Sequence, residues 1–146
     1  MKTGIIYYSA HHGNTKKLLD AIRQADENVD LINVTEEDRD LSGYDRIGIA
    51  SGVYYGSFAK QVLAYAEKHL PMGRPVFLIS TCGAPRKGYF DQIRKVMERR
   101  RNDELGTYQC LGFDTFGPFR LIGGIAKNHP TADEIAGAVR FYRGLK

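Results

Sequence analysis

The sequence has little cysteine and no long apolar run, and both absences narrow what the chain can be. Its 146 residues include only 2 cysteines, Cys82 and Cys110, which form no CxxC pair and no cluster with histidine. Structural zinc sites use such clusters, so we predict no metal site and two reduced thiols. No apolar stretch approaches the roughly 20 residues of a membrane helix. The first residues lead directly into a strand pattern instead of a signal peptide, which predicts a cytoplasmic protein without membrane insertion.

Several motifs of catalysis and nucleotide binding are also missing. The chain contains neither G-x-G-x-x-G after a strand nor G-x-x-x-x-G-K-[ST], so neither a dinucleotide site nor a P-loop is indicated. It has no G-x-S-x-G elbow, and Ser9, His11 and His12 are too close in sequence to argue for a hydrolase triad. Cys82 lies at the end of a predicted strand and is better explained as a small buried residue than as a nucleophile. No catalytic residue is therefore assigned.

What is present fits one compact domain over residues 1–146. The hydrophobic content is 42% and the charged content is 26%, which is ordinary for a chain with a single core. The chain has 21 lysine and arginine residues against 17 aspartate and glutamate residues. The excess of positive charge is concentrated in residues 86–101. Since no nucleic-acid motif accompanies this basic stripe, we interpret it as a solvated helix face and predict no nucleic-acid partner.

Short β-branched or aromatic runs alternate with stretches of helical period, a pattern typical of parallel βα units. Strands are expected at 3–8, 30–34, 45–51, 75–80 and 105–114, and helices near 14–25, 57–70 and 87–101. A last helix opens at Thr131, whose hydroxyl caps it while Glu134 reaches back. The predicted fold class is α/β, a three-layer sandwich with a five-stranded parallel sheet in order 2-1-3-4-5. Residues 117–130 form the longest irregular stretch, either a functional loop or plain surface.

The residues best suited to bind a ligand follow the first, third and fourth of these strands, where ligands of such sheets are found. Residues 9–15 place hydroxyl and amide side chains directly before a helix, an arrangement that suits a phosphate. Residues 52–57 contain two adjacent tyrosines, which can stack on a flat ring or pack in the core. Residues 81–84 complete the set with a Thr-Cys-Gly-Ala turn.

The first of these loops, S-A-H-H-G-N-T, resembles the FMN-phosphate loop of flavodoxins, usually written [ST]-x-T-G-N-T. It keeps the closing Gly-Asn-Thr, but His12 stands in the place of the preceding threonine and Ser9 lies one position further upstream. In this it looks like the S-x-H-H-G-N-T variant of shorter members of the family. The resemblance implies a flavodoxin-like fold and FMN as cofactor. The phosphate-loop residues that it implies are Ser9, His11, His12, Gly13, Asn14 and Thr15.

The second and third loops resemble those that hold the flavin ring in this family. The residues so implied are Gly52, Val53, Tyr54, Tyr55 and Gly56, and then Thr81, Cys82 and Gly83. One of the two tyrosines is expected to stack on the ring, and the third loop to meet its pyrimidine edge with backbone N–H groups. Tyr89 is a second candidate for stacking, although it also fits the inward stripe of its helix. Arg86 and Lys87 stand where many flavodoxins carry acidic residues.

The resemblance implies a non-enzymatic electron carrier that shuttles electrons between redox proteins, whose acidic docking surfaces would suit the basic stripe. The alternative is a flavin-dependent reductase of a quinone, azo compound or porphyrin precursor, which needs a substrate pocket beside the ring. A third class, the receiver-type signalling module, needs acidic residues after the first strand and a phosphoacceptor aspartate after the third. Tyr8-Ser9 and Ser51-Gly52 occupy those places, which disfavours that class.

Overall fold

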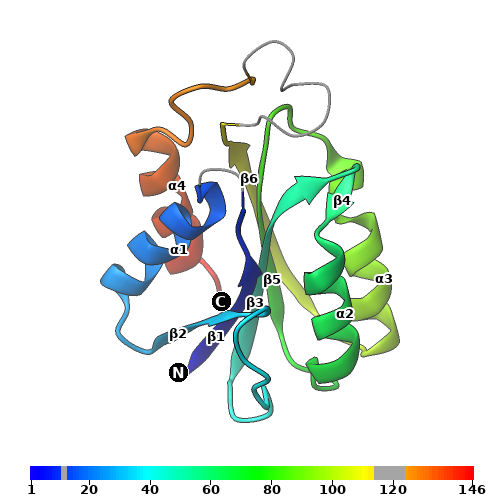
Figure 1. Cartoon of the computed structure of the whole chain (residues 1–146). Coiled ribbons are helices and arrows are strands. Elements are labelled where there is room, and N and C mark those ends of the chain that lie inside the picture. Colours follow the sequence, from blue (N-terminus) through cyan, green and yellow to red (C-terminus); the bar gives the residue numbers. More distant parts are fainter. Residues whose placement is uncertain (11–12, 114–123) are drawn as a thin grey trace.

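The computed structural model describes residues 1–10, 13–113 and 124–146. Its strands are β1 (Thr3–Tyr8), β2 (Val29–Asn33), β3 (Arg46–Tyr54), β4 (Ser57–Phe58), β5 (Val76–Cys82) and β6 (Glu104–Leu111). Its helices are α1 (Asn14–Ala25), α2 (Lys60–His69), the short 3-10 turn η1 (Lys87–Phe90), α3 (Asp91–Arg99) and α4 (Ala132–Arg143). A helix follows each long strand except β2, which leads to β3 without one (Figure 1).

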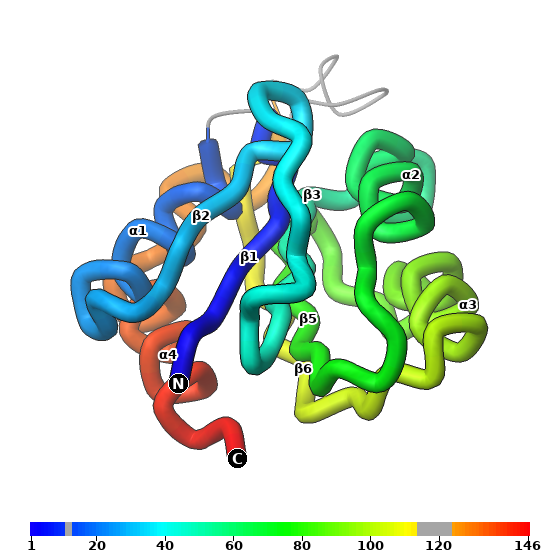
Figure 2. Tube along the Cα trace, turned by 90° about the horizontal axis from the view of Figure 1, so that it is seen from below, coloured from blue at the N-terminus to red at the C-terminus, as the bar shows by residue number. Residues whose placement is uncertain are grey.

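The five long strands form one parallel sheet in the order β2-β1-β3-β5-β6. Counted as long strands, this is the predicted order 2-1-3-4-5, so the predicted α/β topology is confirmed. β5 is buried along its whole length, as expected of a strand that helices cover on both faces. α1 and α4 cover one face of the sheet and α2 and α3 the other, which gives the three layers visible in Figures 1 and 2.

The helix faces that turn toward the sheet are those that the periodicity predicts. The residues of these stripes that are buried are Leu18, Leu19 and Ile22 of α1, Val62 and Ala66 of α2, Phe90, Ile93, Val96 and Met97 before and within α3, and Tyr142 of α4. Leu63, Ile135 and Val139 are partly buried against the same two clusters. Burial of this apolar surface is the main favourable contribution to the stability of the sandwich.

The helix expected from about residue 57 begins later, and its predicted start is wrong. Ser57 and Phe58 instead form β4, which pairs antiparallel with the end of β3. The two residues that connect these strands, Tyr55 and Gly56, have φ angles of 50° and 78°. Positive φ at both loop positions is the mark of a type I′ hairpin turn, whose twist matches that of the flanking strands. Because of this turn, α2 begins only at Lys60.

A polar cluster closes the amino edge of the sheet, the edge where the parallel strands begin. The Arg46 Nε donates to Thr3 Oγ1 at 2.9 Å, and the Arg46 guanidinium lies 4.6 Å from the centre of the Tyr142 ring. The Tyr142 hydroxyl donates to Asp26 Oδ2 at 2.7 Å and approaches Thr3 Oγ1 at 3.2 Å. Burial raises the pKa of Tyr142, so this hydroxyl stays protonated. The contacts join α4 to the first strand and leave the opposite edge as the open end of the sheet.

Candidate functional site

The three predicted loops meet in one cleft at the carboxyl edge of the sheet, the edge where β1, β3, β5 and β6 end. The lining residues are Ala10, Asn14, Gly52, Val53, Tyr54, Thr81, Cys82, Gly112 and Phe113. Six of the predicted site residues are among them, and the contribution of the chain after β6 is new. The cleft lies where strand order reverses around β1 and β3, the usual ligand position in doubly wound sheets.

The first loop leads into α1 through a glycine in a backbone conformation that most other residues rarely adopt. Gly13 is the N-cap of α1 with φ 65°, in the left-handed region, and as a glycine it has no side chain with which to cap the helix. The backbone N–H of Lys16 donates to Ser9 Oγ at 3.3 Å, which places the serine over the first turn. His11 and His12 lie outside the described residues. The start of α1 therefore directs N–H groups and a favourable dipole toward the loop.

Thr15 links the first loop to the third. Its side chain is buried, and its hydroxyl lies 2.9 Å from the hydroxyl of Thr81 at the end of β5. Since a hydroxyl both donates and accepts, each of the two retains capacity for a further hydrogen bond. The contact brings together two loops that lie 66 residues apart in the sequence.

Asn14 gives the cleft an acceptor that has no partner among the described residues. Its Nδ2 donates to the carbonyl of Phe113 at 2.8 Å, while its buried Oδ1 accepts no hydrogen bond there. A Cβ at Gly112 would lie 2.7 Å from the Asn14 Nδ2, so a glycine is needed for this approach. Leaving a buried polar atom unpaired is costly, which makes a ligand hydroxyl a fitting partner. The ribityl chain of FMN carries such hydroxyls, so this residue fits that cofactor.

The two tyrosines of the second loop occupy different environments. Tyr54 lines the cleft, is partly buried against the core, and lies 5.8 Å from the ring of Tyr8, centre to centre. Tyr55 at the hairpin tip is 91% exposed. Ser51 fixes the base of the hairpin, since its Oγ accepts from Ala59 N at 2.9 Å. The hairpin therefore presents Tyr54 in the cleft and leaves Tyr55 exposed at its own tip.

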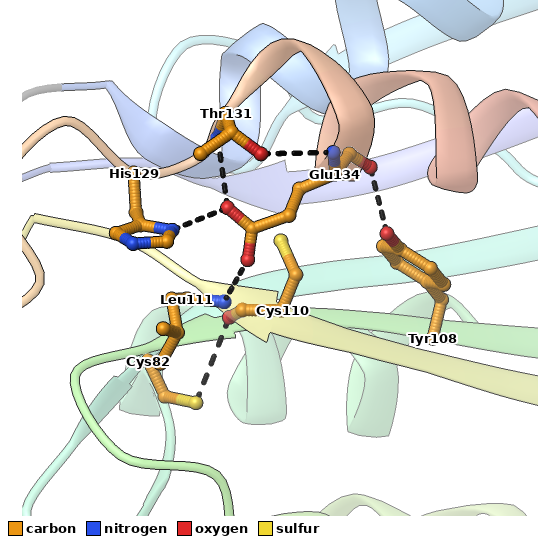
Figure 3. A network of polar contacts seen from close by, with 7 residues as sticks. All are labelled: Cys82, Tyr108, Cys110, Leu111, His129, Thr131 and Glu134. Carbon is orange, nitrogen blue, oxygen red and sulfur yellow. Dashed lines mark hydrogen bonds and ion pairs between the residues drawn. The ribbon is translucent and has the colours of Figure 1, made fainter.

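The two cysteines, Cys82 at the third loop and Cys110 in β6, are both buried and free. Thr81 pairs with Cys110 in the sheet, so the side chains of Cys82 and Cys110 project to opposite faces, as Figure 3 shows. The two cannot form a disulfide without rearrangement of the strands. Burial raises the pKa of Cys110 to about 12, with nearby Glu134 and Cys82 acting in the same direction, so the thiolate is disfavoured.

Beyond the third loop the chain is positively charged and partly committed to structural contacts. Arg94 pairs with Glu104 at 2.8 Å, and Arg99 pairs with Glu67. Arg86 and Lys87, which directly follow the loop, are exposed. Tyr89 lies in η1 and donates its hydroxyl to the carbonyl of Ala84 at 2.9 Å. It is partly exposed and is thus separate from the buried stripe of α3, where only Phe90 of this turn packs.

A carboxylate that the sequence identifies only as a helix cap also secures the end of β6 (Figure 3). Glu134 Oε1 accepts from Thr131 N at 2.8 Å, and Thr131 Oγ1 accepts from Glu134 N at 3.2 Å, so the predicted capping box is confirmed. In addition, Glu134 Oε2 accepts from Leu111 N at 3.2 Å, and Oε1 lies 2.5 Å from His129 Nδ1. Leu111 directly precedes the two β6-side residues that line the cleft.

These contacts keep Glu134 ionised. Partial burial opposes the charge, but hydrogen bonds from Thr131 N, His129 and Leu111 N outweigh it and lower the pKa of Glu134. His129 lies two residues before the capping Thr131. This proximity in the sequence is the signal from which the contact between His129 and Glu134 could have been predicted. Within the described part of the chain, His, Cys, Asp and Glu side chains form no group able to hold a metal ion. No helix of that part combines the length and apolar character that a membrane span requires.

Comparisons with known proteins agree with this geometry. The sequence model of a family described as Flavodoxin domain matches residues 5–112. An uncharacterized protein of Methanocaldococcus jannaschii is 35% identical over 149 residues, which cover 99% of this chain and 98% of that protein.

Solved structures are similar at lower identity. A flavodoxin of Fusobacterium nucleatum bound to flavin mononucleotide superposes with a TM-score of 0.66 and 14% identity, with 100% of both chains covered. A flavodoxin from the domain Archaea gives a TM-score of 0.65 and 17% identity over 96% of this chain and 92% of that one. A larger protein, the rubredoxin oxygen:oxidoreductase of Desulfovibrio gigas, gives a TM-score of 0.73 and 14% identity. The match covers 99% of this chain and 35% of that protein.

Proposed function

Because this chain belongs to the flavodoxin domain family, we propose that it binds FMN in the cleft at the carboxyl edge and carries electrons between redox proteins. The observation that carries the proposal is the meeting of the start of α1, the tyrosine hairpin and the end of β5 around Asn14 Oδ1, an acceptor without a partner in the described part of the chain. The similar fold of the Fusobacterium nucleatum flavodoxin, which binds flavin mononucleotide, supports the same cofactor. Bound FMN would supply the redox chemistry itself.

The residues of the cleft divide the work of holding such a cofactor. The start of α1, with Ser9 and Thr15, would bind the phosphate through N–H groups and hydroxyls. Asn14 would accept from a ribityl hydroxyl. Tyr54 or Tyr55 would cover the ring, and the backbone after Thr81 would meet its polar edge. The cleft would also limit the access of water to the ring, while the exposed basic residues beyond the third loop would attract acidic partners.

The direct test is the visible absorption spectrum of the purified protein, followed by release and identification of the chromophore. We expect a yellow protein that releases FMN on denaturation, or a colourless one that takes up FMN stoichiometrically when it is added. A protein that neither contains nor takes up FMN refutes the proposal. Steady-state oxidation of NAD(P)H then separates carrier from reductase, because a carrier shows slow turnover that added small acceptors do not accelerate.

Alanine substitution of the two tyrosines is expected to separate their roles. Loss of the stacking residue should weaken FMN binding about tenfold, the value of one aromatic contact of roughly 1–1.5 kcal/mol, and relieve quenching of flavin fluorescence. Tyr55→Ala removes an exposed ring and should leave stability nearly unchanged, whereas Tyr54→Ala also loses packing against Tyr8. Fluorescence titration of both variants gives the answer. If neither affinity nor fluorescence changes, the tyrosines do not cover the ring.

The exposed cations after the third loop are expected to raise the potential of the last one-electron reduction of bound FMN. A nearby positive charge favours the added electron by about 1–2 kcal/mol in a partly solvated site, or tens of millivolts, and salt weakens it. Arg86→Gln with Lys87→Gln should therefore lower that potential in a potentiometric titration. Lys95→Gln with Arg101→Gln, which removes two exposed charges farther along, is the matched control. An unchanged potential in the first variant means that the stripe does not tune the flavin.

A further inference from the structure

A second, larger cavity lies beside the proposed FMN cleft. It has a volume of about 580 Å³ and is formed by the β3–β4 hairpin and the first turn of α2. Ala10 and Tyr54 line both cavities and so form a common wall between them. The volume lies within the range of about 300–1,000 Å³ that is typical of small-molecule sites. Tyr54 and Tyr55, which the proposed function places at the flavin ring, also line this cavity, whereas its other lining residues have no role given above.

The walls of the cavity are mainly aromatic and aliphatic. Phe58 is buried and held in an edge-to-face contact with Phe90, with ring centres 5.6 Å apart. Tyr8 and Leu63 are partly buried against the same core cluster. Because these side chains are packed from behind, the cavity exists without a ligand and does not have to be opened. Flat rings match such walls, since aromatic pairs gain from offset and edge contacts.

The cavity lining also carries polar groups, among them Gln61 and Gln92, and its charged and unpaired groups favour a negative charge. The hydroxyl of Ser57 is buried and has no hydrogen-bond partner among the described residues, although Ser57 lines the cavity. Lys60 is the sole charged residue of the described lining. It is the first residue of α2, a helix with neither a side-chain cap nor an acidic residue in its first turn. The end of the helix dipole, the ammonium group and the hydroxyl thus favour an anion together.

We propose that this cavity binds a flat aromatic carboxylate of one or two rings, with the rings against Tyr8, Tyr54 and Leu63 and the carboxylate at Ser57 and Lys60. Binding in this cavity does not need a flavin. If FMN occupies the cleft as proposed above, the bound molecule lies next to it, because Tyr54 lines both cavities. It would then change the surroundings of a flavin bound in the cleft.

The test is isothermal titration calorimetry with 2-naphthoate, on the protein as isolated and on the protein saturated with FMN. We expect binding to both forms, and roughly tenfold weaker binding of uncharged 2-naphthamide because the charge-assisted contacts are lost. Lys60→Gln and Ser57→Ala should each weaken naphthoate binding by a similar factor. Lys68→Gln, the same change at an exposed position of α2 outside the cavity lining, should have no effect. Amide chemical shifts of Phe58 and Leu63 should move on titration, which reports the site independently of the variants.

Three results overturn the proposal: no binding of naphthoate, competition between naphthoate and FMN for one site, or equal losses in Lys60→Gln and Lys68→Gln. Competition would mean that the cavity is part of the flavin site, and equal losses would mean unspecific attraction. The proposed function fails differently. A protein that takes up no FMN but binds naphthoate, with the expected dependence on Ser57 and Lys60, refutes the FMN proposal and leaves this one standing.

Discussion

Replacing Ser9 and Thr15 together by alanine is expected to weaken FMN binding about 100-fold while changing riboflavin binding less than about threefold. A hydrogen bond to a charged group contributes roughly 1.5 kcal/mol or more, so two hydroxyls at a phosphate account for this factor. Riboflavin lacks the phosphate and should be nearly insensitive. Dissociation constants for both ligands, from quenching of flavin fluorescence, give the comparison.

Thr81→Ala is the matched control, because the Thr15 hydroxyl is paired with that of Thr81 at 2.9 Å. The control breaks the same contact between the first and third loops but leaves both proposed phosphate ligands in place. We expect it to change the affinities for FMN and riboflavin by the same factor. Equal losses for the two ligands in the double variant would show that the phosphate binds elsewhere.

Glu134→Ala is expected to lower the free energy of unfolding by about 2–4 kcal/mol at pH 7. The change removes half of a capping box, worth about 1 kcal/mol, and leaves the N–H groups of Leu111 and Thr131 without their acceptor, at roughly 1–3 kcal/mol. Thr131→Ala removes the other half of the box and should cost only about 1 kcal/mol. Urea denaturation measures both free energies, provided that the dependence of the unfolding free energy on urea concentration is the same in each variant. A loss for Glu134→Ala no larger than that for Thr131→Ala would show that the contact to β6 contributes nothing.

The contribution of Glu134 should also depend on pH in a definite direction. Hydrogen bonds lower its folded pKa below the ordinary value of 4.5, so the folded state stabilises the ionised form. The stabilisation is therefore fully present above about pH 5 and is lost as the pH falls through the folded pKa. The difference in stability between the wild type and Glu134→Gln should shrink correspondingly in acid. A difference that stays constant down to pH 3 would exclude ionised Glu134 as its source.

The sequence predicts the fold well because each level of the pattern agrees with the others. The apolar runs alternate with helical periods, and the resulting strand order brings three separate loops to one edge of the sheet. Thr131 and Glu134 lie three residues apart, so their capping box is a local signal. The start of α2 is the exception, because the turn at Tyr55 and Gly56 depends on backbone angles that tyrosine seldom adopts.

The contacts within the site are harder to predict because they join distant residues. Asn14 and Phe113 are 99 positions apart, and Leu111 and Glu134 are 23 apart. Such hydrogen bonds depend on the separation of neighbouring strands in the folded protein. They correspond to no periodic pattern in the sequence. That Asn14 Oδ1 finds no partner among residues 1–10, 13–113 and 124–146 is likewise visible only in the structure. The roles of the predicted loops toward FMN therefore stay predictions that the variants above decide.

The position of the two termini at the amino edge of the sheet determines how the protein can be attached to a surface or to another protein. β1 starts at Thr3, and α4 returns to the same edge, where Tyr142 meets Thr3 (Figures 1 and 2). Both Met1 and Lys146 lie toward that edge, away from the cleft. A linker attached at either terminus, to an electrode or to a fused redox enzyme, thus anchors the protein by the far end. The face proposed to exchange electrons would remain turned outward, within reach of a freely diffusing partner.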